Sequence, residues 1–178
     1  MQSLILIFLL LTLSFSCTRT LPHAKAGYKS IHSHIDTMEN SEDWLGSSIG
    51  GSFYDGDIKQ LIVNFYVKTE EFNIEYARSL IVKGIETFLS SINENDQLIP
   101  HLNHFPFTYN DLDYGISVYT PEWKWLGYVF LVNGRLCFYE VNEFDNLDKV
   151  HEEPYPKALH KIKAGLAVPV PQFPGKRT

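Results

Sequence analysis

Cysteine is scarce in this sequence, and its scarcity excludes two kinds of small protein. The 178 residues contain only Cys17 and Cys137. Two cysteines this far apart are too few for the disulfide framework of a small secreted domain, and no Cys-x-x-Cys pair indicates a zinc or redox site. Cys137 lies in a strongly apolar run and is predicted to be a small buried hydrophobic residue.

Positive charge and glycosylation sites are also in short supply. Fifteen lysines and arginines stand against twenty-one acidic residues, which leaves a net charge of −6. Nucleic-acid binding relies on basic contacts to phosphates, so we expect no nucleic-acid partner. No Asn-x-Ser/Thr sequence occurs anywhere, which favours a bacterial protein over a secreted eukaryotic glycoprotein.

Long hydrophobic runs are absent except at the N-terminus. Residues 1–16 carry no charged side chain, and their apolar core extends from Leu4 to Leu13. A helix of that length covers roughly 15 Å, about half of the hydrocarbon core of a bilayer. The segment is therefore predicted to be a signal peptide for export, with Ser16 as the small residue beside the cut.

The residues around this cut resemble a bacterial lipobox, in which a cysteine after a small residue becomes acylated. The resemblance implies lipidation of Cys17, a membrane anchor, and export to the cell envelope. Thr18 stands where some bacteria place the Asp that retains lipoproteins at the inner membrane, so the outer membrane is expected. Ser14 and Phe15 depart from the residues that lipoboxes prefer. Plain secretion after cleavage near Ser16 therefore stays open as the alternative.

About 160 residues follow the signal, which is enough for one domain with its own core. Residues 17–29 are polar and are predicted to form a tether. Residues 30–163 are predicted to form a single domain, and residues 164–178, with three prolines, an extended tail.

The hydrophobic periodicity within the domain predicts an α+β fold. Apolar residues alternate over 58–68 and recur with the helical period over 69–93, where Thr69 is expected to cap the helix. Asn133-Gly134 predicts a hairpin turn between two apolar strands. We expect a mostly antiparallel sheet of about four strands with helices packed on one face. The expected elements are helices near 31–38, 69–93 and 154–163, strands at 58–68, 114–120, 127–132 and 135–141, and loops at 40–57 (with a short strand near 49–53) and 95–111.

Several short motifs spread over about two thirds of the chain carry a family resemblance. They are Ile49-Gly50-Gly51-Ser52, Tyr76-Ala77-Arg78, Ser91-Ile92-Asn93, Ile99-Pro100-His101-Leu102, Phe105-Pro106-Phe107, Glu152-Glu153-Pro154-Tyr155 and Ala158-Leu159. With these motifs the chain resembles a set of uncharacterised secreted proteins or lipoproteins from intracellular bacteria such as chlamydiae. The resemblance implies export and a shared fold, and it supplies no catalytic residue.

Two short patterns suggest a catalytic or a metal-binding site. Gly46-Ser47-Ser48-Ile49-Gly50 matches the G-x-S-x-G motif of serine hydrolases, which needs Ser48 on a sharp turn between a strand and a helix. His101 and His104 are spaced closely enough to chelate a metal, although no cysteine or clear carboxylate accompanies them. A small exported hydrolase and a metal-binding protein are therefore alternatives, and we expect no cofactor.

Trp123 and Trp125 suggest binding instead. On an extended segment, residues two apart point to the same side, so both indoles are predicted to share one face and form a platform for a glycan or a protein. The sequence therefore favours an exported, lipid-anchored binding or structural module of the bacterial envelope, without catalytic activity, whose partner is an envelope or host protein.

Overall fold

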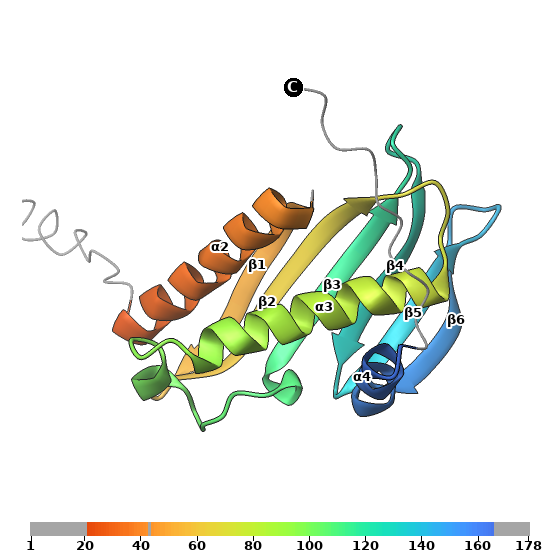
Figure 1. Cartoon of the computed structure of the whole chain (residues 1–178). Helices are drawn as coiled ribbons and strands as arrows, with labels where there is room; N and C mark the ends of the chain where they lie inside the picture. The colour runs from red at the N-terminus through yellow and green to blue at the C-terminus, as the bar shows by residue number, and fades with distance from the viewer. Residues whose placement is uncertain (1–20, 43, 166–178) are drawn as a thin grey trace, which may run out of the picture.

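A computed structural model describes residues 21–42 and 44–165 of the chain as one six-stranded sheet with helices on a single face (Figure 1). The strands lie side by side in the order of the sequence. The elements are α2 (Pro22–Glu42), β1 (Leu45–Tyr54), β2 (Asp57–Lys68), α3 (Ile74–Asn93), the short 3-10 turns η1 (Ile99–His101) and η2 (Tyr109–Asp111), β3 (Leu112–Tyr119), β4 (Trp125–Val132), β5 (Arg135–Val141), β6 (Leu147–Pro154) and α4 (Tyr155–Lys163).

The sheet is antiparallel except in its middle. β2 and β3 run parallel, with Phe65 opposite Ile116, while all other neighbouring strands are antiparallel. A parallel pair needs a crossover connection, and α3 supplies it by crossing the sheet from β2 to β3. The predicted α+β class is therefore confirmed, with six strands in place of about four.

The core lies between the sheet and the three helices. Leu61, Val63 and Phe65 of β2 are fully buried, and they alternate with residues that remain partly exposed. α3 contributes the apolar stripe that its helical periodicity predicted, including Ile81, Ile85 and Phe88. No helix among residues 21–42 and 44–165 is long and apolar enough to cross a membrane.

The hairpin turn at Asn133-Gly134 is confirmed. Asn133 has a φ of 49° and Gly134 a φ of 70°, as the mirror-image turn of a two-residue hairpin requires. β4 and β5 pair on either side of the turn, with Val132 opposite Arg135. Cys137 lies on β5 and is buried, as expected.

The two strands that the sequence predicted only in part or not at all are edge strands. The expected short strand near 49–53 is part of β1, whose remaining residues were predicted to be loop because the segment is rich in Gly and Ser. β6 was not predicted because it is mostly polar and charged. An edge strand is paired on one side only and is largely exposed, so it shows little apolar alternation. The hydrogen-bonding edges of β2 and β5, rather than local apolar pattern, hold these two segments in the sheet.

Two helix starts also differ from the sequence prediction. α2 begins at Pro22, inside the segment predicted as tether, because Ala24, Ile31 and Met38 provide a buried stripe longer than the 31–38 pattern. α3 begins at Ile74 instead of 69. Asn73 caps it by accepting hydrogen bonds from the backbone of Glu75 and Tyr76.

Candidate functional site

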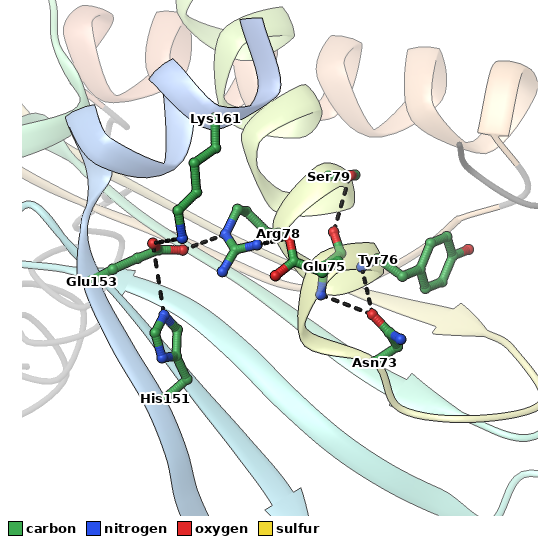
Figure 2. Close-up of polar contacts among 8 residues, drawn as sticks. All are labelled: Asn73, Glu75, Tyr76, Arg78, Ser79, His151, Glu153 and Lys161. Atoms are coloured by element: carbon green, nitrogen blue, oxygen red, sulfur yellow. Dashed lines mark hydrogen bonds and ion pairs between the residues drawn. The ribbon is translucent and has the colours of Figure 1, made fainter. Parts of the chain in front are cut away.

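A buried charged cluster connects α3, β6 and α4 (Figure 2). Arg78 on α3 donates from Nε to Glu153 on β6 and from Nη1 to Glu75. Lys161 on α4 donates to the second oxygen of Glu153 at 2.7 Å. Arg78 and Glu153 are each no more than 2% exposed. A pair so deeply buried is tolerated only because every charge meets an opposite one.

This cluster belongs to the fold. Burial alone would raise the pKa of Glu153, yet hydrogen bonds from Lys161 and Arg78 hold its pKa below the usual value. The carboxylate is therefore ionised at neutral pH, and both of its oxygens accept hydrogen bonds from the cations beside it. Glu153 therefore links β6 to α3 and α4, and its paired carboxylate is not available to act as a general base.

A second buried polar group lies between α2 and the sheet. The His34 Nε2 is 2.9 Å from the hydroxyl of Tyr114, and its ring stacks on Phe88 at 4.4 Å between centroids. Its Nδ1 has no hydrogen-bond partner in the described part of the chain. Burial lowers the pKa of His34 to about 4, so the ring is neutral at pH 7. His34 is therefore a core residue.

The opposite face of the sheet carries no helix from the described residues, and we call it the open face. It displays the alternate side chains of each strand, among them Asn64 and Tyr66 on β2 and Tyr128 on β4. Aromatic rings are concentrated here. Phe130 stacks on Tyr128 at 5.2 Å and on Tyr139 at 5.6 Å. Partly exposed aromatic surface of this kind is typical of interaction sites.

One end of the open face holds what we call the aromatic cluster. It joins the connection between β3 and β4 to the end of β2, and its rings lie 5.5 to 6.5 Å apart. The ammonium of Lys68 lies 3.9 Å from the centre of the Trp123 ring, a cation–π contact. Its members are Tyr66, Tyr119, Trp123 and Trp125.

Trp123 and Trp125 therefore contribute to one cluster, but not in the predicted way. Residues 120–124 form a turn closed by hydrogen bonds between Thr120 and both Trp123 and Lys124, and Trp123 has a φ of 69°. The expected extended segment is wrong, because the chain must reverse here between two antiparallel strands. Tyr119 brings the indoles together by contacting both of them. Trp123 is 50% exposed, whereas Trp125 is half-buried and donates to the carbonyl of Gly127.

The hydrolase motif lies in the wrong kind of element. Ser48 is in the middle of β1, paired with Asn64 of β2, and its Oγ accepts a hydrogen bond from the Asn64 amide at 2.9 Å. The strand-to-helix turn that a nucleophile elbow needs is not present around Ser48, because β1 continues directly into the hairpin with β2.

The histidine pair gives the metal alternative no support. His104 uses both ring nitrogens, one within 3.1 Å of the Pro106 carbonyl and the other within 2.9 Å of Asp111. His101 lies in η1. Across residues 21–42 and 44–165, no group of three or more histidine, cysteine, aspartate or glutamate side chains could hold a metal ion.

Several residues that carry the resemblance stated above make internal contacts. Arg78 and Glu153 form the buried pair, and the Asn93 side chain exchanges two hydrogen bonds with the Phe107 backbone. These contacts stabilise the fold of this chain. No family model, curated protein or solved structure matches this chain.

Apart from Trp123 and Trp125, the aromatic side chains of the open face were not predicted from the sequence to be binding residues. Tyr66, Tyr119, Phe130 and Tyr139 all lie within predicted strands. Their alternation with buried neighbours was visible, but it does not reveal which face a helix covers. Cys17, the predicted lipidation site, lies outside the described residues.

Proposed function

We propose that this chain is an exported, lipid-anchored module of a bacterial envelope that binds a partner on the open face of its sheet. One observation carries the binding part of this proposal: the aromatic cluster, in which Trp123 is half exposed beside three other rings and the Lys68 ammonium. Clustered aromatic rings supply much of the energy of protein interfaces, since they bury a large area with little loss of conformational freedom.

The anchor proposal rests on the lipobox resemblance at Cys17. Since α2 begins at Pro22, the five residue steps between them span at most about 18 Å when fully extended. Acylation of Cys17 would therefore hold the domain close to the bilayer. A palmitate label should follow the wild-type protein in its host and disappear in Cys17→Ser. A label retained in that variant would exclude the anchor and leave export standing.

Site-specific photo-crosslinking in the envelope tests the binding proposal. A photoreactive phenylalanine derivative is placed at Trp123 and, in a matched control, at Phe144. Phe144 is another exposed aromatic residue, located in the turn between β5 and β6. We expect a crosslinked product of one defined mass from position 123 and none from position 144. Equal products from both positions, or none from position 123, would contradict the proposal.

A substitution of the same residues gives a second readout. Used as bait, the Trp123→Ala variant should recover at least about tenfold less of the partner identified by crosslinking than the wild-type protein does. A loss of this size is expected for an aromatic residue at the centre of an interface. Phe144→Ala should leave recovery unchanged. The thermal unfolding of both variants should stay close to that of the wild type, since neither ring is buried.

A further inference from the structure

The open face also contains a hollow where β2, β3 and β4 run next to one another, toward the start of β3 and away from the aromatic cluster. Its opening lies on the side of the sheet away from the helices. The side chains around it combine apolar, aromatic and acidic chemistry. They are those of Ile62, Asn64, Asp113, Tyr128, Phe130 and Val132.

Gly115 of β3 allows two of the lining side chains, those of Asn64 and Tyr128, to meet. It lies between Asn64 and Phe130 in the register of the three strands. A Cβ at Gly115 would overlap the Asn64 carbonyl and the Tyr128 hydroxyl, so these two groups meet above a residue without a side chain. Tyr128 donates to the Asn64 Oδ1 at 3.0 Å, and the Asn64 amide donates to Ser48. These polar groups therefore satisfy one another.

Asp113 differs from them. Its carboxylate has no hydrogen-bond or ion-pair partner among residues 21–42 and 44–165, although it is partly buried between Ile62 of β2 and the β4 side chains. Burial raises the pKa of Asp113, and its charge adds to the effect of burial in raising the pKa of Tyr128. The carboxylate has thus lost part of its hydration without gaining a donor, which is an unfavourable arrangement that a cationic ligand would relieve.

We infer that this hollow binds a cationic side chain, lysine or arginine, of a partner protein. Both side chains have an aliphatic stem and a charged head. The stem matches Ile62 and Val132, the ring of Phe130 attracts a cation, and the head pairs with Asp113. A sugar fits less well, because it needs several free polar groups and Asn64, Tyr128 and Ser48 are engaged with one another. The inference rests on the proposed function, since it names the chemistry of the partner that the open face receives.

An NMR titration of the isotope-labelled full chain tests it with three small probes. Butylguanidinium reproduces the arginine side chain, butylammonium reproduces the lysine side chain, and butylurea is the neutral control. We expect saturable shifts in the amide signals of residues 113–116 and 128–132 with one or both cations. Butylurea should give none. Binding should weaken as salt is added, because the ion pair is only partly buried.

Two variants give the matched control. Asp113→Asn should weaken cation binding at least about fivefold, since it removes one partly exposed ion pair while keeping the side chain's shape. Glu143→Gln removes an exposed acid in the turn after β5 and should bind like the wild type. Equal cation binding by Asp113→Asn and the wild type would overturn the inference, and so would the absence of saturable shifts.

The C-terminal tail is an alternative occupant, because it carries Lys176 and Arg177. If replacing both by Ala shifts the same signals without any probe, the hollow receives the chain's own tail and the inference is overturned. Failure of the inference and of the proposed function remain distinguishable. Crosslinking at Trp123 without cation binding at Asp113 removes only the inference, whereas no crosslinking removes the function.

Discussion

The two faces of this sheet use similar residues in different ways. Phe65 and Tyr66 are adjacent on β2 and point to opposite sides. Phe65 is fully buried against Trp44 and Tyr114, whereas Tyr66 is partly exposed and contacts Tyr119 and Trp123. The helices α2, α3 and α4 cover the first face (Figure 1), and no helix of the described residues covers the second. The covered face holds the fold together, and the open face presents aromatic surface that remains accessible.

The same contrast holds for charge. Glu153, on the covered side, has both oxygens bound by cations and is buried. Asp113, on the open side, has no partner among the described residues. A carboxylate that is needed for folding finds its partner within the chain, while an unpaired one is available to a ligand. Stability measurements on paired substitutions, one on each face, test whether the covered face contributes more to the free energy of unfolding than the open face.

The largest difference is expected between the adjacent rings of β2. Phe65→Ala leaves a cavity in the core and should lower the free energy of unfolding by about 4 kcal/mol. Tyr66→Ala removes a partly exposed ring and should lower it by about 1 kcal/mol or less. Urea unfolding of both variants measures the two values. Similar losses would mean that both faces are equally part of the core.

The buried ion pair gives the second comparison. Glu153→Gln leaves Arg78 with less than its full compensation in the core, and should cost about 3 kcal/mol. Glu152 is the next residue on β6 and pairs with Arg135 and Lys149 at the surface. Glu152→Gln should leave stability nearly unchanged. Urea unfolding of both variants measures the two losses in the free energy of unfolding. A large loss in Glu152→Gln would contradict the prediction.

Acid should act through the covered face. The pKa of His34 falls from its ordinary 6.5 to about 4 in the folded chain, because burial disfavours the charged ring. Between these values the unfolded chain binds a proton that the folded chain does not. Stability is therefore complete above pH 6.5 and falls by about 3 kcal/mol in total as the pH drops to 4.

His34→Phe provides the control for this pH dependence. The variant lacks the titrating ring, so its unfolding free energy should decline less steeply over the same interval. Urea unfolding at half-unit steps of pH compares the two slopes. Parallel curves for the wild type and the variant would show that His34 is not the responsible group.

The smallest expected effects come from the same substitution on each face. Tyr114→Phe deprives the buried His34 of its hydrogen bond and should cost about 1 to 2 kcal/mol. Tyr128→Phe removes the bond to Asn64 on the open face, where water can replace it, and should cost about 0.5 kcal/mol or less. Thermal unfolding resolves the difference. Equal losses of stability in the two variants would indicate that water does not reach the open face and that this face is covered.

Local patterns were enough to predict much of the fold. The alternation along β2, the helical period of α3 and the Asn133-Gly134 turn each require only neighbouring residues, and each was confirmed. β1 and β6 could not be predicted in the same way, since edge strands are held by the hydrogen-bonding edge of a neighbour. The cap at Asn73 was also missed. Thr69 instead extends the strand pairing, with its amide bonded to the Tyr119 carbonyl.

The candidate site shows the same division. Trp123 and Trp125 were predicted as binding residues from their spacing, yet a tight turn and the ring of Tyr119 place them together. Asp113 has no local pattern that distinguishes it from any other strand aspartate. Its position beside Ile62 follows from the parallel pairing of β2 and β3, which depends on the crossover of α3.

The sequence by itself determined the α+β class, the central strands and the long helix, because hydrophobic periodicity acts over a few residues. It also carries the expectation of export and of an anchor at Cys17. The prediction that the helices pack on one face of the sheet is likewise confirmed. Only the tertiary structure decided that Arg78 meets Glu153, and that Asp113 and the aromatic cluster lie on the face without helices. These results depend on which segments pack against each other, and contacts between residues distant in the chain decide that.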